Sequence, residues 1–562
     1  MVSPRLLVVF VAAASTLLAQ VPPGQFERIK QEGLERSQVM QHLDHLVNRI
    51  GPRLTSSDNL TVACEWAADT FRSFGLTNVH LEQWGEFPVG FNRGPWWGRM
   101  TQPEPMELIC NTDSWTAGTR MPSRGPLLPA PKTTEALAAL QGRLAGVWLL
   151  NPDFAMLEAL STALREEGGF GFVTGRAARS GRGESDLLLT GGSSRVAFDK
   201  LPTLPMVRLR SDCYEKLQAL LDDGKAVEVE FDIRNHFRKG PIPLYNVIAD
   251  LPGSERPDEY VVVGGHIDSW DGATGTTDNG TGTATTLEAA RILMAIGAKP
   301  RRTIRFMLWS GEEQGLLGSR AWVQKHKDEM AKYSACLVHD GGTNYVSGIA
   351  GMVEMRPQLE TAFAPVFELA KDLPFRVRDI EAFRPIGSDH ESFTAAGVPG
   401  FFWDQAGRAN YTHTHHTQYD TYDAAIPEYQ RHSAVVIATG ALGLANLPEL
   451  LTRENMKVQR GFSGGAGGGD GPRGRLLGVM MRADGVTIDA VTADGVGAKA
   501  GLKPGDKILK IGDTVIKEQR DLRPAMTAGP AKNTVTFLRD GVEQTATIEF
   551  PAAPQPPAGG GR

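Results

Sequence analysis

The sequence predicts an α/β protein whose main domain is a mostly parallel mixed sheet flanked by helices. Between residues 259 and 447, strands that are apolar along their whole length, such as EYVVVGGH and RTIRFMLWS, alternate with helical segments such as TTLEAARILMAIG. Such strands, separated by helices, are typical of a parallel sheet covered on both faces. The polar motifs follow the strands, where these sheets place their chemistry. The length of 562 residues predicts further domains, because single cores stop growing at roughly 250 to 300 residues.

The N-terminus has the three-part layout of a secretory signal peptide. Arg5 precedes an apolar run over residues 6–18, and the small residue Ala19 is followed by a proline-rich stretch. We expect residues 1–19 to be removed, so that the mature chain begins near Gln20 and is secreted or periplasmic. The alternative is an uncleaved N-terminal anchor. No second apolar stretch of about 20 residues follows, so no transmembrane segment is expected.

Residues 20–108 and 238–450 are expected to form the main domain in two pieces. The first piece begins with helices, because apolar residues recur at helical spacing between residues 39 and 50, and Ser57 with Asp58 can cap a second helix that ends near Gly75. Between the pieces, residues 109–237 change to short β-branched or apolar runs such as AGVWLL and GFGFVTG. We interpret them as a small inserted module; the alternative is that they belong to one large domain.

Three segments follow the main domain. Residues 451–473 predict a glycine-rich linker that is too poor in apolar residues to pack. Residues 474–551 contain short apolar runs such as DKILKIGD and predict a small β-rich domain. Residues 552–562 are expected to be a disordered tail because they are rich in proline and glycine.

The composition excludes some classes of function and site. The chain has 41% hydrophobic and 22% charged residues, as soluble globular proteins do, and its formal net charge of -6 gives no basic surface for nucleic acid, so no nucleic-acid partner is expected. Four scattered cysteines form no CxxC pair, namely Cys64, Cys110, Cys213 and Cys336. Their spacing argues against a thiolate zinc site and leaves one or two disulfides open.

Five polar clusters fall after the predicted strands or beside them. His266 and Asp268 follow YVVVGG, Glu312 and Glu313 follow IRFMLWS, and Asp340 follows ACLV, while DNG and THTHHTQYDT are the other two clusters. We expect them to converge on one sheet edge. Histidine nitrogens and carboxylate oxygens without thiolates suit catalytic zinc, and a pair of ions needs a bridging ligand such as a carboxylate. Of two adjacent glutamates, one can bind metal while the other accepts a proton from the attacking water.

These motifs resemble those of the co-catalytic di-zinc exopeptidases, a family that includes secreted bacterial aminopeptidases and plasma glutamate carboxypeptidase. The resemblance covers roughly residues 41–447 and rests on GGHIDSWDGATGTTDNGTG, WSGEEQGLLGS, HDGG, GSDHESFTAAGVP and HHTQYDT in that order. It implies the zinc exopeptidase fold and two Zn2+ ions. His266 and Asp340 would then be terminal ligands of one zinc, Glu313 and His416 terminal ligands of the other, and Asp278 would bridge both.

The resemblance also implies catalytic roles. Glu312 would be the general base and later the acid, and Asp268 would orient the imidazole of the first histidine ligand. His415 would occupy the position of a residue that stabilises the tetrahedral oxyanion. His413 is expected to be a surface loop residue, and His339 a structural one. The family's substrate pocket matches the stretch at residues 388–390, either as support or as direct contacts.

Both accessory modules resemble known companions of these peptidases. Residues 109–237 look like a protease-associated domain, whose expected role is to narrow access to the cleft and so to favour short peptides. Residues 474–551 resemble a PDZ domain of the bacterial protease type, which binds an extended peptide C-terminus by strand addition. The alternative for this last domain is that it has no ligand and only packs.

We therefore predict an exported, zinc-dependent exopeptidase, an aminopeptidase or dipeptidase that hydrolyses short peptides. Three alternatives stay open: a carboxypeptidase of the same fold, an N-acyl amino acid amidohydrolase, and a catalytically inactive receptor or scaffold. Lost metal ligands would favour the inactive scaffold, yet every expected ligand is present in the sequence.

Overall fold

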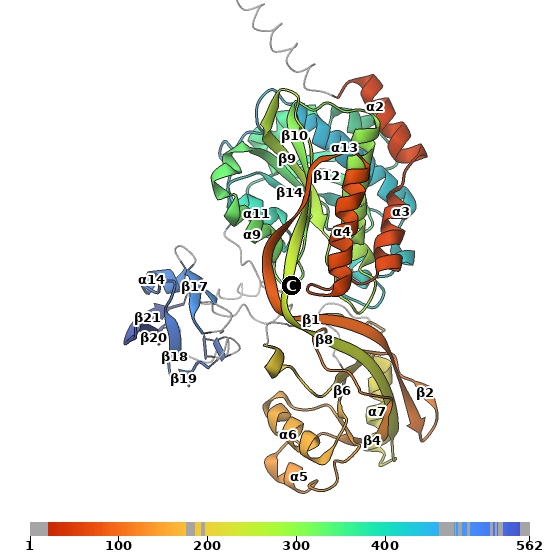
Figure 1. Ribbon diagram of the computed structural model, residues 1–562, viewed down its shortest axis with the longest axis vertical. Coiled ribbons are helices and arrows are strands. Elements are labelled where there is room, and N and C mark those ends of the chain that lie inside the picture. Colours follow the sequence, from red (N-terminus) through yellow and green to blue (C-terminus); the bar gives the residue numbers. More distant parts are fainter. Residues whose placement is uncertain are drawn as a thin grey trace, which may run out of the picture. The chain divides into compact units, whose positions relative to one another are not determined.

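The computed structural model divides the chain into two compact units, residues 1–467 and 468–562 (Figure 1). It describes residues 21–175, 186–192, 197–459, 477, 479–481, 486–491, 495–517, 521–522, 525–526 and 532–550. The expected signal peptide and tail, and residues 460–473 of the expected linker, lie outside the described residues.

The centre of the larger unit is a mixed sheet that is mostly parallel in its core. Strands β14 (Gly400–Phe402), β11 (Tyr333–Val338), β9 (Arg256–His266) and β10 (Arg302–Trp309) lie side by side in this order and run parallel, and β8 (Glu228–Leu251) pairs antiparallel with β10. The α/β fold expected from the apolar strands is confirmed.

Both faces of this sheet are buried, as its apolar strands require. In β10, Ile304, Phe306 and Leu308 belong to one hydrophobic core, whereas Met307 and Trp309 belong to the core on the opposite face. Figure 1 shows helices on both sides of the sheet. The larger core includes side chains of α4 (Asp58–Ser73), α8 (Thr281–Ala295) and α13 (Pro427–Asn446), and the smaller core includes side chains of α9 (Leu317–Lys325) and α11 (His390–Ala395).

The first helices pack where the sequence placed them. The side chain of Ser57 caps α4 by accepting a hydrogen bond from Leu60 N at 3.1 Å, and Gly75 follows the helix with a φ of +87°. A glycine tolerates this left-handed backbone without steric cost, so the chain can turn from α4 into β1. The preceding short helices are α2 (Pro23–Lys30) and α3 (Val39–Asp44).

Two long strands connect the core to the inserted module. β1 (Thr77–Gln102) and β8 pair antiparallel from Thr77↔Asp250 to Gln102↔Glu228, and Figure 1 shows this ribbon running from one part to the other. β4 (Ser123–Pro129) joins β8 in the module. The remaining elements of the module are β2 (Met106–Glu107), β3 (Cys110–Thr112), β5 (Trp148–Leu150), β6 (Gly171–Gly175), β7 (Met206–Leu209), α5 (Thr134–Ala138), α6 (Leu157–Glu167) and α7 (Ser211–Asp222).

A small second sheet completes the larger unit. It has the order β13 (Arg376–Ile380), β12 (Tyr345–Met352) and β15 (Asp404–Ala406). The neighbouring helices are α10 (Arg356–Ala362) and α12 (Tyr411–Thr414).

The smaller unit is β-rich and has a hydrophobic core of its own, which includes Ile488, Ile508 and Phe537. Its described elements are β16 (Val479–Met481), β17 (Ile488–Val491), α14 (Val496–Lys499), β18 (Lys507–Ile511), β19 (Thr514–Val515), β20 (Lys532–Arg539) and β21 (Val542–Glu549). Residues 474–476 and 478, at the start of this expected domain, lie outside the described residues.

Two further expectations concern the membrane and the cysteines. In the part of the chain that the structure describes, no helix has the length and apolar character needed to cross a membrane. The four cysteines are all buried free thiols, so the structure contains none of the disulfides that the sequence left open among them.

Candidate metal centre

The polar clusters converge at the carboxyl ends of the core strands. His266 is the last residue of β9 and pairs with Trp309 at the end of β10. Glu312 and Glu313 follow β10, and Asp340 lies two residues after β11. Because β9, β10 and β11 are parallel, these side chains come from neighbouring strand ends, as the sequence predicted.

Asp278 comes from an irregular segment that leads into α8. Residues 276–280 are fully buried, and Asp278 itself has an extended backbone with φ −134° and ψ 88°. The next turn packs very closely, because a Cβ on Gly282 would lie 2.1 Å from the carbonyl oxygen of His339. Only glycine allows this approach of α8 to the end of β11, which brings Asp278 to the strand ends.

The first group of donor atoms surrounds the Nε2 atom of His266. Asp340 Oδ1 lies 3.1 Å from it, Asp278 Oδ1 lies 3.2 Å from it, and Glu312 Oε2 lies 3.9 Å from it. The potential ligand atoms of His266, Asp278 and Asp340 all lie within 4.8 Å of one another. One metal ion can therefore be held by these three side chains.

The second group uses the other oxygen of the same aspartate. His416 Nε2 lies 3.0 Å from Asp278 Oδ2 and 3.0 Å from Glu313 Oε2. His415 Nε2 is more distant, 3.6 Å from Asp278 Oδ2. The carboxylate of Asp278 thus lies between two histidine-containing groups, with one oxygen directed to each.

A backbone contact fixes which nitrogen of His266 is free. His266 Nδ1 lies 3.0 Å from the carbonyl oxygen of Asp268, and a carbonyl can only accept, so Nδ1 carries the hydrogen and Nε2 faces the carboxylates. The carboxylate of Asp268 is 3.6 Å from this ring and instead accepts hydrogen bonds from Thr55 Oγ1 and from the backbone amides of both glutamates. Asp268 therefore orients the ring through its main chain and the loop of Glu312 and Glu313 through its side chain.

Crowded carboxylates and histidines shift one another's pKa values in this site. Burial and the nearby Asp278 carboxylate raise the pKa of Glu313 to about 7, and burial also raises the pKa of Asp340. Burial works against protonation of His416, but the Glu313 and Asp278 carboxylates outweigh it and raise the pKa of His416 to about 10. Glu313 and Asp340 thus favour their protonated forms more than ordinary carboxyl groups do, whereas contacts with His266 and His416 lower the pKa of Asp278 against the effect of burial.

Two carboxylate oxygens also lack hydrogen bonds. Glu313 Oε1 is buried without a hydrogen-bond partner among the described residues, and Asp278 Oδ2 makes no hydrogen bond of good geometry there although His416 Nε2 lies 3.0 Å away. Buried carboxylates are normally paired or bound to metal. The nitrogen and oxygen donor set, with no sulfur, suits zinc. The residues present therefore fit a pair of zinc ions.

Glu312 has the surroundings expected of a proton carrier. Its side chain is nearly buried, and burial raises its pKa well above the usual carboxyl value, against the opposing charge of His266. Asp389 is also fully buried, its pKa is raised to about 7 by burial, and neither of its carboxylate oxygens has a hydrogen-bond partner among the described residues. The raised pKa of Glu312 makes its carboxyl hold a proton more readily than that of an ordinary glutamate does.

The other predicted histidines occupy three different settings. His415 stacks on His416 with ring centroids 3.9 Å apart, and its ring is 4.9 Å from that of Tyr411. His413 stacks on Tyr419 at 4.4 Å. His339 is buried, accepts a hydrogen bond from an amide of the second sheet at 3.0 Å, and has a pKa lowered to about 4 by burial, which fits the structural role expected for it.

The structure adds residues that the sequence did not single out. Arg53 is fully buried and donates to the carbonyl oxygens of Ile267, Thr274 and Gly275 at 2.7 to 3.0 Å, so it holds both ends of the loop after His266. Nothing in GPRLTSSD distinguishes this arginine from a solvated one.

Two further residues lie in the histidine-rich motif or directly before it. Asp420 accepts hydrogen bonds from the backbone amide and the hydroxyl of Thr277, which precedes Asp278. Burial raises the pKa of Tyr411 well above its usual value, and nearby carboxylates including Asp278 add to the effect. The motif HHTQYDT contained the signal for Asp420, whereas Tyr411 had none.

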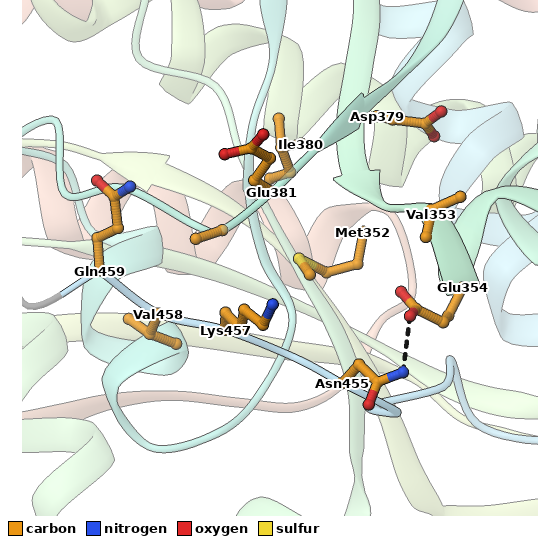
Figure 2. Close-up of a pocket in the computed structure, with 11 residues that line it drawn as sticks. Met352, Val353, Glu354, Asp379, Ile380, Glu381, Asn455, Lys457, Val458 and Gln459 are labelled. Atoms are coloured by element: carbon orange, nitrogen blue, oxygen red, sulfur yellow. Dashed lines mark hydrogen bonds between the residues drawn. The ribbon is translucent and has the colours of Figure 1, made fainter.

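A large hollow of about 790 Å3 lies elsewhere on the same unit (Figure 2). It is lined by the end of β12, the end of β13 and residues 455–459, and includes a hydrogen bond of 2.8 Å between Asn455 and Glu354. Its described lining contains none of the predicted site residues. This hollow is therefore separate from the candidate metal centre.

Comparisons with known proteins agree with the two units. Residues 246–440 match peptidase family M28, and residues 476–550 match the PDZ domain. The first match contains every predicted ligand.

Similar full-length proteins have been described as peptidases. The chain is 26% identical over 454 residues to carboxypeptidase Q of Bos taurus and 26% identical over 436 residues to that of Homo sapiens, and each alignment covers 75% of this chain and 88% of the relative. A solved structure of a peptidase M28 precursor from Shewanella amazonensis SB2B is 26% identical in sequence and has a TM-score of 0.55. The superposition covers 76% of this chain and 97% of that structure.

Proposed function

We propose that this chain, a zinc metallopeptidase of the M28 type with a C-terminal PDZ domain, is an exported exopeptidase that uses two zinc ions to hydrolyse short peptides. The observation that carries the proposal is the position of Asp278. One of its oxygens lies 3.2 Å from His266 Nε2, and the other lies 3.0 Å from His416 Nε2.

The ligands follow from this arrangement. His266 and Asp340 would hold one zinc, Glu313 and His416 would hold the other, and Asp278 would bridge them. Zinc bound there would polarise the scissile carbonyl and lower the pKa of water.

The remaining chemistry is proton movement by the chain's own residues. Glu312 takes a proton from the attacking water at its carboxylate and later gives that proton to the leaving amine. Its raised pKa favours the protonated form that the second step needs. His415, which stacks on His416, would donate a hydrogen bond to the oxygen of the attacked carbonyl.

The accessory parts have proposed roles of their own. The module between β1 and β8 is a protease-associated-like insert that narrows access to the site and favours short peptides. The PDZ domain binds a peptide C-terminus. Export is proposed from the N-terminal signal layout, and sequencing the native protein checks it, because an intact Met1 in a cytoplasmic fraction would contradict export.

Product analysis by mass spectrometry tests the proposed reaction. An unblocked tetrapeptide, its N-acetylated form and its C-amidated form are incubated with the zinc-loaded protein. Loss of single residues from the free N-terminus identifies an aminopeptidase, and loss from the free C-terminus identifies a carboxypeptidase. Hydrolysis of none of the three, with both zinc ions bound, would contradict the proposal unless dipeptides are split, so the panel includes two dipeptides.

A further inference from the structure

A short segment of the inserted module reaches the loop that carries His416. This segment, residues 186–192, is called the strap here. Its residues Leu188, Leu189 and Thr190 are buried. The strap lies more than 200 residues before the histidine loop in the chain, yet it pairs with that loop at an isolated β-bridge between Leu189 and Thr417.

The contact between strap and loop is made largely by backbone atoms. Thr190 N donates to His416 O at 2.9 Å, and Gln418 N donates to Leu188 O at 3.1 Å. The side chain of Gln418 bonds both ways, since its Oε1 accepts from Leu188 N at 2.7 Å and its Nε2 donates to Asp186 O at 2.7 Å. The loop is therefore held on both sides of Thr417.

Other residues of the inserted module form hydrogen bonds with the strap. Leu189 O accepts hydrogen bonds from Arg208 Nη1 at 2.9 Å and from Asn111 Nδ2 at 3.1 Å. Arg208 is itself fixed by an ion pair with Asp113. A continuous series of hydrogen bonds thus runs from strands β3 and β7 through Leu189 and Thr190 to the main chain of His416.

His416 needs such support more than the three candidate ligands at the strand ends. His266, Glu313 and Asp340 lie at or just beyond the ends of core strands, whereas His416 follows the four-residue helix α12. Its φ is +57°, a left-handed backbone that is unfavourable for a residue with a Cβ, and its side chain is 25% exposed. Such a conformation persists only where neighbouring contacts hold it.

We infer that the inserted module is a structural part of the second zinc site, with Arg208 and Gln418 as positioning residues for His416. This inference rests on the proposed function, because it takes His416 to be a zinc ligand. The module then does more than cover the cleft: one ligand is in place only while the strap is docked. By linkage, zinc bound at this site must also stabilise docking of the strap.

Two substitutions test the inference from opposite ends. Arg208→Met removes the donor to Leu189 from the module, and Gln418→Leu removes the clamp from the loop, while neither changes a proposed ligand. Arg124→Met is the matched control, because Arg124 forms an exposed ion pair with Glu228 in the same module and does not contact the strap. Arg208→Lys keeps a donor and is the conservative rescue.

Zinc binding is measured for each full-length protein by competition with a chelator, and hydrogen exchange is followed for peptides covering the strap and residues 414–420. Both test variants should bind one of two zinc ions ~10-fold or more weakly, the usual effect of losing support behind a ligand, and keep the other at parental affinity. Hydrogen exchange of residues 414–420 should be faster in Arg208→Met than in the parent. The control should match the parent, and Arg208→Lys should lie between.

Three results decide against the inference. Parental affinity for both ions in folded Arg208→Met and Gln418→Leu would overturn it. Equal weakening of both ions would also overturn it, because that indicates general loss of structure. If the parent protein binds no zinc, the proposed function is contradicted, and hydrogen exchange alone then tests the inference. Unchanged hydrogen exchange of residues 414–420 in Arg208→Met would show that the strap does not support the loop, and faster exchange would show that it does.

Discussion

Glu312 and Glu313 are neighbours in the chain with different contacts. Glu313 Oε2 lies 3.0 Å from His416 Nε2, whereas Glu312 Oε2 stays 3.9 Å from His266 Nε2. Glu312→Gln should keep both zinc ions and lower turnover by at least ~10²-fold, because it removes a proton acceptor without removing a ligand. Glu313→Gln should weaken or lose one zinc, because an amide is a poor substitute for a carboxylate ligand.

Metal content by mass spectrometry beside the rate of each variant separates the two roles. The assignment is reversed if Glu312→Gln loses zinc while Glu313→Gln keeps it. Parental rates in both variants would exclude the proposed mechanism.

Asp278 is the residue whose loss should affect both ions. Asp278→Asn replaces the shared carboxylate by a neutral amide that cannot bridge with two charged oxygens, so both zinc affinities should fall. Asp379→Asn serves as control, because Asp379 is an exposed partner of Arg356 far from the site in the fold. Chelator competition checks the result, and weakening of only one ion would argue against a bridging role.

Motifs that follow apolar strands predict where several candidate ligands lie. His266, Glu313 and Asp340 could be predicted because each follows an apolar strand of a parallel sheet. Arg53 could not, because its role is set by carbonyl groups of a loop more than 200 residues away, with which no local pattern connects it.

The buried histidine of α13 makes the stability of the fold depend on pH. Burial lowers the pKa of His432 to about 4, and its ring packs edge-on against Tyr345 at 5.6 Å. A histidine with a lowered folded-state pKa contributes stability that is present above its unfolded value near 6.5 and is lost as the pH falls toward 4, by roughly 3 kcal/mol in full.

His432→Leu should therefore lose less stability than the parent between pH 6.5 and pH 4. Denaturant unfolding of both proteins at matched pH and zinc concentration measures the difference. Parallel loss of unfolding free energy in the two proteins would show that His432 does not titrate with folding.

The elements themselves were predictable to different degrees. The strands of the core and the helix α4 follow from apolar pattern and capping, which are local. The loop that carries His416 is different, because its backbone is fixed by Thr190 and Gln418 contacts to a distant segment of the module. The order of the motifs predicts a ligand in this loop, but it does not predict the distant segment that holds the backbone of the loop.

The whole molecule consists of two units with separate hydrophobic cores. A chain ending at Gln459 should therefore fold, bind zinc and hydrolyse short peptides with the parental kcat/KM, because every proposed catalytic residue lies in the first unit. Steady-state kinetics of the truncated and full-length proteins checks this. A truncated protein that is folded and zinc-loaded but inactive would show that the PDZ domain takes part in catalysis.

The sequence also predicted a change of character within the first unit, but not how the parts join. β1 and β8 each continue from the core sheet into the module, so the two parts share strands instead of meeting at a linker. A local pattern of apolar residues can predict that a strand exists. It cannot predict that the strand continues from one hydrophobic core to another, because this depends on pairing with residues far away in the sequence.

Anomalous diffraction at the zinc edge, from crystals of the zinc-loaded protein, tests whether Asp278 bridges two zinc ions. We predict two peaks, one beside His266 and Asp340 and one beside Glu313 and His416, with Asp278 between them. A single peak, or peaks that leave Asp278 without a metal contact, would contradict the proposed bridged pair of ions.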